Sequence, residues 1–207
     1  MMIPKQLTRD QLETIRRIMV KRIAKNLTAE KLSFLMGRRS DYVTNIELFD
    51  ADPYTTADIK RVAIAMQERD LKSFYAGVSD QTRIKVIMET REYGSQIMYA
   101  CSTLSAGHTK QLYFTLQEEM PAAVRLIENN AYDGPIALDA IELLIRAGYF
   151  FKCRMPATIY HKVNRFLNVT LSPTYIQEAL NNFCEGDREG ALKRMEIAGK
   201  GIFYTEA

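Results

Sequence analysis

The 207-residue sequence is poor in the residues that build covalent or metal-stabilised folds. Its three cysteines, Cys101, Cys153 and Cys184, are odd in number and lie 52 and 31 residues apart, which suits neither a disulfide framework nor a zinc site. We expect them to be reduced thiols in the core. The only histidines, His108 and His161, are 53 residues apart and have no Cys, His or Asp at ligand spacing, so we expect no metal site.

Long apolar runs and the motifs of common enzymes are also missing. No stretch of roughly 18 or more uninterrupted apolar residues occurs, and residues 1–10 are polar, which predicts a non-secreted, cytoplasmic protein without a membrane segment. The sequence contains no phosphate-binding P-loop, no GxGxxG and no GxSxG. Glu118, Glu119 and Glu142 are interpreted as ordinary acids on helix surfaces. We therefore expect no catalytic residues, no cofactor and no enzymatic activity.

The net charge of the sequence is small, but basic residues are concentrated toward its N-terminal end. The net charge is +3, whereas residues 1–72 hold 14 basic and 10 acidic residues, and residues 16–39 hold eight basic residues and one acidic residue. A block with a net charge of +7 could neutralise the phosphates of a nucleic acid. Charge alone favours the alternative, which is a solvated helix face.

Helical periodicity dominates the sequence, and strand alternation is nearly absent. Apolar residues recur at steps of three and four in three series: Leu12, Ile15, Ile18 and Met19; Ile59, Val62, Ala63 and Met66; Leu138, Ile141, Leu144 and Ile145. The only candidate strand is Gly201–Thr205. The pattern therefore predicts an all-α protein with about nine or ten helices.

Aromatic residues are distributed unevenly and indicate two cores. Sixteen of the twenty aromatic residues follow position 72. We predict an N-terminal domain over residues 1–72 and a larger helical domain for oligomerisation or sensing over residues 73–207. A turn-like stretch at 130–135 marks a possible subdivision of the second domain.

The most informative segment is Leu27–Glu47, with the sequence LTAEKLSFLMGRRSDYVTNIE. Two short helices that cross steeply need a small residue at the crossing, a glycine at the turn and apolar residues inside. Ser33, Gly37, Val43 and Ile46 meet these needs in order. Gly37 can adopt the left-handed conformation that ends one helix and redirects the chain.

Upstream, Arg22 continues the inward-facing series Ile15, Ile18 and Met19 at helical spacing. A guanidinium in an apolar interior needs a carboxylate partner. Glu47 lies beside inward-facing Ile46 at the end of the second short helix. We predict a structural salt bridge between Arg22 and Glu47.

Together these residues resemble the Cro/C1-type (XRE-like) helix-turn-helix domain of phage repressors and bacterial transcription regulators. The resemblance covers about residues 10–67 and rests on Arg22, Leu27-Thr28, Leu32, Ser33, Gly37, Val43, Ile46-Glu47 and a closing helix at 59–66. It implies a five-helix, lambda-repressor-like DNA-binding domain in a bacterial regulator. In that family an arginine and a glutamate at the places of Arg22 and Glu47 form a salt bridge.

The resemblance also implies a recognition helix from about Ser40 to Leu48 that faces the major groove. The implied DNA-binding residues are Lys25, Lys31, Arg38, Arg39, Ser40, Asp41, Thr44 and Asn45. Three features depart from the family: Ala29 replaces a phosphate-contacting glutamine, Leu48-Phe49 replaces Asn-Gly, and Asp50 and Asp52 add negative charge. These departures suit a protein partner as well as double-stranded DNA.

The C-terminal region offers a weaker comparison. Its order of helices, over 136–147, 157–168, 173–185 and a basic amphipathic segment at 188–198, is similar to the carboxy-terminal part of RteC-type regulators of mobile elements. That similarity implies a second helix-turn-helix-like unit, whereas the residues alone favour a plain oligomerisation bundle. We therefore expect a homodimeric, sequence-specific DNA-binding transcriptional regulator with room for a protein partner or small-molecule effector. The alternative is a protein–protein adaptor that does not bind DNA.

Overall fold

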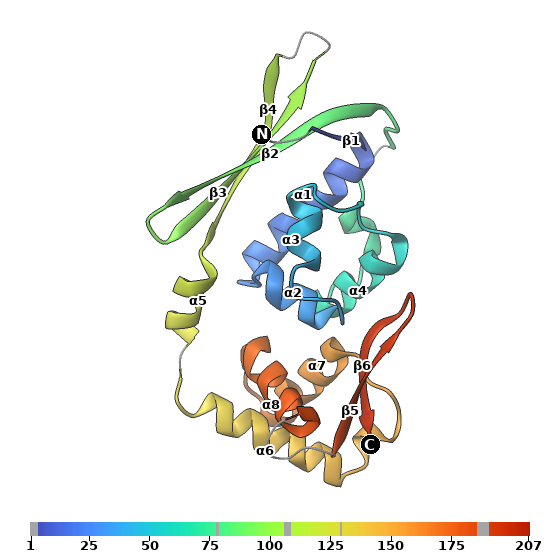
Figure 1. Cartoon of the computed structure of the whole chain (residues 1–207), viewed down its shortest axis with the longest axis vertical. Helices are drawn as coiled ribbons and strands as arrows, with labels where there is room; N and C mark the ends of the chain where they lie inside the picture. Colours follow the sequence, from blue (N-terminus) through green and yellow to red (C-terminus); the bar gives the residue numbers. More distant parts are fainter. Residues whose placement is uncertain (1–3, 78, 106–108, 129, 186–190) are drawn as a thin grey trace. The chain divides into compact units, whose positions relative to one another are not determined.

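The structure is a computed structural model that describes residues 4–77, 79–105, 109–128, 130–185 and 191–207 (Figure 1). The chain is 47% helical and 25% strand, so the predicted all-α class is wrong and the fold is mixed α/β. The helices in the described ranges are α1 (Arg9–Ala24), α2 (Ala29–Leu35), α3 (Tyr42–Glu47), α4 (Thr56–Met66), α5 (Pro121–Glu128), α6 (Asp133–Arg146), α7 (Pro156–Leu167) and α8 (Pro173–Glu185). None of these described helices has the length and apolar character needed to cross a membrane.

Two antiparallel sheets account for the strands. The first contains β1 (Lys5–Thr8), β2 (Arg83–Tyr93), β3 (Gln96–Leu104) and β4 (Lys110–Glu119) in that order, and the second is a hairpin of β5 (Leu192–Ile197) and β6 (Gly201–Glu206). In the β2–β3 hairpin, Tyr93 pairs with Gln96, so the loop consists of Gly94 and Ser95. Gly94 has φ = +59°, which a residue without a side chain adopts readily.

The strands of the larger sheet were missed because their apolar residues do not alternate cleanly. In β2, Val86 and Met88 are buried, but Ile87 on the opposite face is half-buried. In β4, Leu112 and Tyr113 are both exposed, at the point where the pairing with β3 shifts register. A sheet whose faces are both partly apolar loses the period-two pattern that identifies a half-buried strand. The loop Gly94-Ser95 between two runs rich in β-branched and aromatic residues is the signal that indicates a hairpin.

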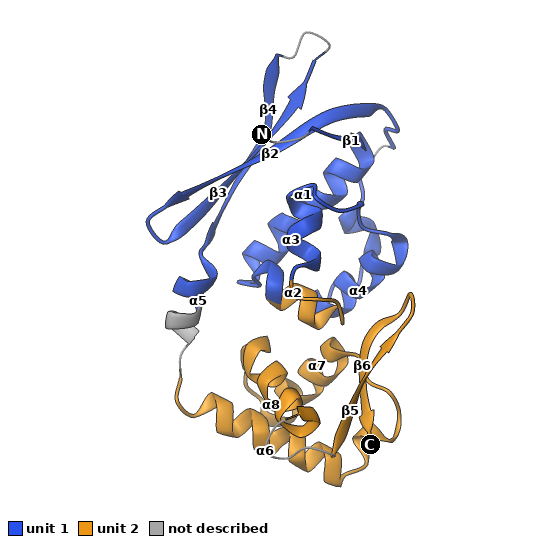
Figure 2. Ribbon diagram, in the orientation of Figure 1, with its two compact units in different colours: residues 1–30, 41–127 blue, residues 31–40, 128–207 orange. Residues whose placement is uncertain are grey.

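The chain divides into two compact units, coloured separately in Figure 2. One comprises residues 1–30 and 41–127, and the other comprises residues 31–40 and 128–207. We call them the sheet unit and the hairpin unit. Residue 72, the predicted domain boundary, lies inside the sheet unit, and the chain enters the hairpin unit close to the predicted break at 130–135. Helix α2 is split between the units, and the residues after it belong to the hairpin unit.

In the sheet unit, the start of α1 is held by side chains that satisfy its free amide groups. Thr8 and Gln11 form a capping box, in which the Gln11 amide donates to the Thr8 hydroxyl at 3.2 Å and the Thr8 amide donates to Gln11 Oε1 at 2.8 Å. The Asp10 carboxylate accepts hydrogen bonds from the Asp80 amide at 2.7 Å and the Ser79 hydroxyl at 2.8 Å. The entry to β2 is therefore tied to the first turn of α1.

In the hairpin unit, helices α6, α7 and α8 occupy the three segments predicted as helices, but the fourth segment does not. Residues 192–197 of the predicted helix at 188–198 form strand β5, and residues 188–190 lie outside the described residues. The predicted strand Gly201–Thr205 is confirmed as β6, which pairs with β5 from Ile197↔Gly201 to Leu192↔Glu206. The spacing of apolar residues predicted a helix at 192–197. These residues form a strand because β6, which follows a few residues later, pairs with them.

Candidate nucleic-acid interface

The candidate site is built on α1, whose inner face ends in a charged side chain. Leu12, Ile15, Ile18 and Met19 are almost completely buried, and Arg22 one turn further on is also fully buried. An unpaired guanidinium in this position would cost several kcal/mol in lost hydration. The geometry around Arg22 is therefore decisive for how the sheet unit is assembled.

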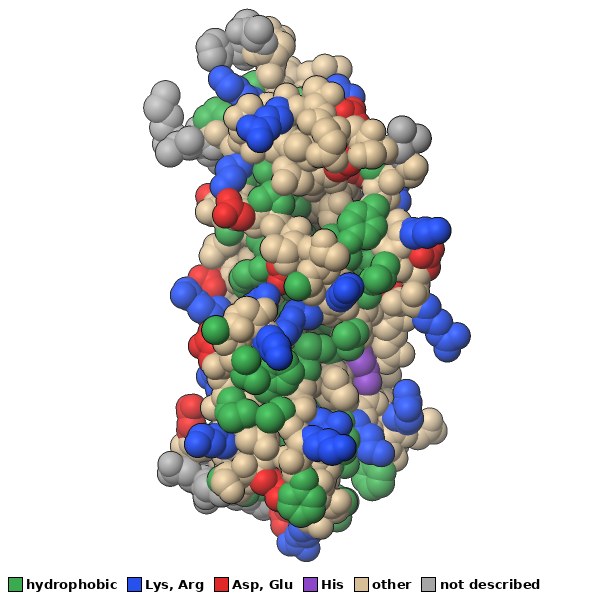
Figure 3. All heavy atoms as spheres, turned by 90° about the vertical axis from the view of Figure 1, so that its right-hand side faces the viewer, with side chains coloured by type: hydrophobic (Ala, Val, Ile, Leu, Met, Phe, Trp, Pro, Cys, Tyr) green, Lys and Arg blue, Asp and Glu red, His purple; other side chains and the backbone are tan. Residues whose placement is uncertain are grey.

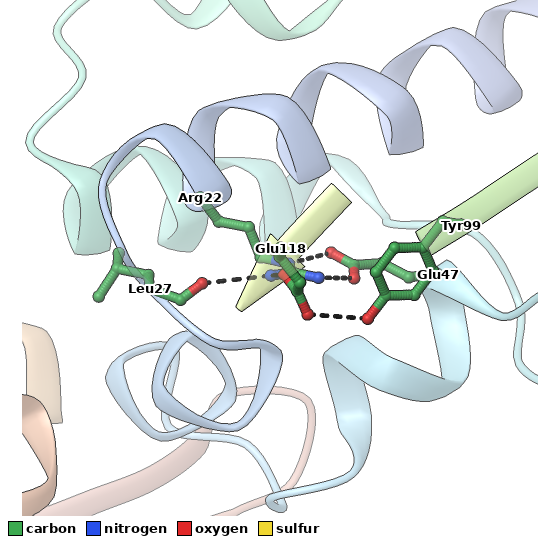
Figure 4. A network of polar contacts seen from close by, with 5 residues as sticks. All are labelled: Arg22, Leu27, Glu47, Tyr99 and Glu118. Atoms are coloured by element: carbon green, nitrogen blue, oxygen red, sulfur yellow. Dashed lines mark hydrogen bonds and ion pairs between the residues drawn. The ribbon is translucent and has the colours of Figure 1, made fainter. Parts of the chain in front are cut away.

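Arg22 binds Glu47, at the end of α3, through two parallel hydrogen bonds (Figure 4). Arg22 Nε donates to Glu47 Oε1 at 2.7 Å, and Nη2 donates to Oε2 at 2.5 Å. Arg22 Nη1 also donates to the carbonyl oxygen of Leu27 at 3.2 Å. Because a guanidinium fork fixes both distance and orientation, this ion pair holds α3 against α1 in one register.

A second carboxylate, which sequence reasoning missed, completes the network. Arg22 Nη1 donates to Glu118 of β4, and the hydroxyl of Tyr99 in β3 donates to the other oxygen of Glu118 at 2.8 Å (Figure 4). Glu118 is therefore not a helix-surface acid, since it joins the sheet to the α1–α3 pair. It continues the half-buried series Phe114 and Leu116 along β4, so strand periodicity is the signal that would have found it.

The network contains a guanidinium, two carboxyl groups and a phenol, and burial acts on the pKa values of Arg22, Glu47 and Tyr99. Burial by itself would lower the pKa of the Arg22 guanidinium, but Glu47 and then Glu118 outweigh it, and the pKa lies well above its usual value. Burial raises the pKa of Glu47 against the opposing attraction of Arg22. The pKa of Tyr99 is raised first by burial and then by the Glu118 charge, so its hydroxyl stays protonated as a donor.

Helix α3 is shorter than predicted, since it spans Tyr42–Glu47 instead of about Ser40 to Leu48. Its inner side chains, Val43 and Ile46, are almost completely buried. Of the implied DNA-binding residues, Lys25, Arg39, Ser40 and Asp41 are exposed, Arg38, Thr44 and Asn45 are half-buried, and Lys31 is only 6% exposed. Arg39, Ser40 and Asp41 thus offer consecutive exposed polar side chains just before α3.

Most of the basic block at residues 16–39 is occupied by ion pairs. Glu13 accepts hydrogen bonds from Arg16 and Arg17, and this lowers the pKa of its carboxyl group. Glu68 lies within 3.6 Å of the ammonium groups of both Lys21 and Lys25. Arg22 is buried and paired with Glu47 and Glu118. The net charge of +7 in the sequence therefore does not become a +7 surface.

The distribution of basic side chains on the surface is consistent with these ion pairs. On the face drawn in Figure 3, basic side chains are scattered among acidic and apolar ones and form no continuous patch. The basic side chains on this face therefore do not form a broad stripe.

The cysteine and histidine residues differ in burial and do not form a common site among the described side chains. Burial raises the pKa of the Cys101 thiol to about 12 and that of the half-buried Cys184 thiol to about 11. Cys153 is exposed, so the expectation that all three are core thiols is wrong for this residue. His161 is half-buried beside Tyr160, and His108 lies outside the described residues. Among the described side chains, no cluster of three His, Cys, Asp or Glu could hold a metal ion.

Comparison with known proteins adds no relative. No protein-family model, no curated protein and no solved structure matches the chain. The resemblance to the Cro/C1-type domain therefore rests on the residues and their spacing.

Proposed function

We propose that this protein is a sequence-specific DNA-binding transcriptional regulator that acts in the cytoplasm as a homodimer. The observation that carries the proposal is the buried, two-bonded contact between Arg22 and Glu47, which fixes α3 on α1. A recognition helix must be held rigidly, because a shift of about one residue would misplace every base contact. In this position, α3 and the residues just before it serve as the reading element.

The reading chemistry would come from a few polar side chains. The amide of Asn45 can bond bidentately with adenine, and the Asp41 carboxylate can accept a hydrogen bond from the N4 amino group of cytosine. Arg39, which is exposed, can reach a phosphate or guanine. Asp50 and Asp52 are exposed after α3 and would repel a phosphate placed near them, so the groove contact involves the start of α3 rather than its end.

The basic pair just before α3, half-buried Arg38 and exposed Arg39, tests this proposal directly. Arg38→Ala combined with Arg39→Ala should weaken binding to a selected duplex by about tenfold and reduce the dependence on salt, because two phosphate-reaching charges are removed. Fluorescence anisotropy over a salt series measures both. Lys60→Ala with Lys72→Ala is the matched control, since both lysines are exposed and the same charge is lost. Equal binding by the two double variants would exclude this segment as a DNA contact.

A protein-binding adaptor is the second candidate, and the neutralised basic block favours it. Glu13 and Glu68 between them bind four of the eight basic residues of that block, and Lys31 is buried. A surface with few free cations is better suited to a protein partner than to phosphates. Failure to enrich any sequence from random duplex DNA with the full chain would leave the adaptor as the remaining function.

The homodimer is expected to form through residues 73–207. Among the side chains that the structure describes, thirteen large apolar ones are exposed, and ten of these lie in this region, including Leu112 at 61% on the edge strand β4. An edge strand that exposes apolar residues is suited to pairing with a second copy. Leu112→Lys should shift the protein from dimer to monomer in sedimentation velocity at micromolar concentration. Leu71→Lys, an exposed leucine outside this region, should leave the dimer intact.

A wild-type chain that sediments as a monomer at this concentration would contradict the dimer. A single recognition helix would then have to read its site alone, and specificity would require a different partner.

A further inference from the structure

The hairpin unit contains a helix-turn-helix formed by α7 and α8, in the region where the sequence left a second helix-turn-helix-like unit and a plain oligomerisation bundle as alternatives. Helix α7 ends at Leu167 and α8 begins at Pro173, and the turn between them is held by Asn164, whose side-chain oxygen accepts a hydrogen bond from the Leu171 amide at 3.0 Å. Asn168 closes α7 with φ = +54°, a left-handed conformation that asparagine tolerates. The two helices therefore have a defined relative orientation.

The β5–β6 hairpin is attached firmly to this pair of helices. It follows α8 along the chain, and β6 also pairs with Arg154, just before α7, through reciprocal backbone hydrogen bonds between Arg154 and Tyr204 at 2.8 and 2.9 Å. The Ile202 amide, two residues earlier on the same edge of β6, donates to the Gly37 carbonyl at 2.8 Å. Helix, turn, helix and hairpin thus form one block, the arrangement of a winged helix-turn-helix (Figure 1).

The outer face of α8 is polar. Ile176, Leu180 and Phe183 are buried against the rest of the unit. The outward positions are Thr174, Gln177, Glu178, Asn181 and Glu185, and no large apolar side chain is exposed on α8, β5 or β6 as described. Amide side chains one helical turn apart can form paired hydrogen bonds with bases in the major groove, whereas a protein interface would need apolar anchors.

Exposed basic side chains flank α8 on both neighbouring elements. Helix α7 carries Lys162 and Arg165 and no acidic residue. The hairpin carries three exposed basic residues, Lys193, Arg194 and, at its tip, Lys200, against two acids, Glu196 and Glu206. In contrast, α6 carries three acids and one base, although apolar side chains are exposed on both helices, Ile136 and Leu143 on α6 and Phe166 on α7. An anionic partner would therefore be attracted to the surface formed by α7 and the hairpin, and not to α6.

We infer that the hairpin unit is itself a duplex-DNA-binding module. Helix α8 enters the major groove with Gln177, Glu178 and Asn181 toward the bases, and the basic residues of α7 and the hairpin bind the phosphates on either side. Glu178 accepts a hydrogen bond from the amino group of cytosine, which makes it a specificity residue and not an affinity residue. This inference does not depend on DNA contacts by α3.

The test uses the full chain and random-sequence duplex DNA, with anisotropy measured over a salt series. The variant Lys193→Ala/Arg194→Ala/Lys200→Ala should bind about tenfold more weakly, and the slope of log affinity against log salt should fall by about two to three. A second variant, Lys162→Ala/Arg165→Ala, should act in the same direction. The matched control is Lys60→Ala/Arg91→Ala/Arg146→Ala, which loses the same charge from other exposed positions and should bind like the wild type. Circular dichroism checks that each variant is folded.

The outcomes separate this inference from the proposed function. If the hairpin variant binds with the affinity and salt slope of the wild type, the hairpin unit does not bind DNA and the inference is overturned. If the hairpin variant loses affinity but Arg38→Ala/Arg39→Ala does not, the inference stands and α3 is excluded as the DNA contact. Loss in both variants supports two DNA-binding modules in one chain.

A base-preference experiment tests the assigned role of α8. Glu178→Gln should change the preferred bases in a selection from random duplexes, while leaving the salt slope as in the wild type because no phosphate contact is lost. Glu185→Gln, at the last residue of α8, is the matched control and should select the same sequences as the wild type. If the wild type and Glu178→Gln select identical sequences, α8 does not contact the bases through Glu178 and the assigned role is wrong.

Discussion

Replacing Arg22 with methionine is expected to lower the free energy of unfolding by about 3 to 5 kcal/mol, because two carboxylates then lose their shared cation in the interior. Glu47 is 1% exposed and Glu118 is 9% exposed by side chain, so neither can recover hydration without structural change. Glu47→Leu should cost less, since Glu118 remains to pair with Arg22. The double variant should be less destabilised than the sum of the two single variants, by about 0.5 to 3 kcal/mol.

The pH dependence gives an independent check on Arg22→Met. Burial raises the pKa of Glu47 above its ordinary value of 4.5, and loss of the guanidinium raises it further. A carboxyl group with a raised pKa in the folded state favours folding below its unfolded pKa, and this contribution is lost as pH rises through the folded pKa. The deficit relative to the wild type should therefore be smaller at acidic pH than at neutral pH. Urea unfolding at both pH values measures it, and simple additivity of the single variants would show that Arg22 and Glu47 do not interact.

Replacing Phe49 with glycine or alanine is expected to separate packing from backbone strain just after α3. Phe49 has φ = +67°, a conformation that is unfavourable for a bulky residue, yet its side chain is only 7% exposed. Burial of the ring is worth about 3 to 5 kcal/mol, whereas relief of the left-handed conformation by glycine returns about 1 to 2 kcal/mol. Phe49→Gly should therefore be destabilised by about 2 to 3 kcal/mol.

Phe49→Ala loses nearly the same packing but keeps a side chain in the left-handed region. It should be less stable than Phe49→Gly by about 1 kcal/mol, the reverse of the order found in helices. Thermal or urea unfolding compares the two variants. An alanine variant as stable as the glycine variant would show that residue 49 is not held at positive φ.

The helical part of the fold could be predicted because its information is local. Leu12, Ile15 and Ile18 mark one face of α1 by spacing alone, and the same spacing placed Arg22 on that face. Since a buried guanidinium requires a carboxylate, Glu47 could be named as its partner without coordinates, and the two residues are hydrogen-bonded in the structure. The end of α2 was similarly local, since Gly37 adopts φ = +67°.

The sheet and the hairpin were not predictable in the same way, because a strand is decided by the partner it finds. Residues 192–197 have a spacing that suits a helix, but β6 lies a few residues beyond and pairs with them. Glu118 can be predicted as a partner of Arg22 only when β4 is recognised as a strand, because Arg22 and Glu118 are 96 positions apart. No local pattern connects them.

Charge illustrates the same division. The sequence by itself determined that residues 16–39 carry a net charge of +7, that α1 buries an arginine and that Glu47 is its partner. Only the tertiary structure decided that Glu68 and Glu118, far along the chain, take up three of those basic residues, and that the exposed cations of the hairpin unit flank a polar helix. Periodicity reports which face of an element is buried, whereas charge pairing over long separations depends on chain topology.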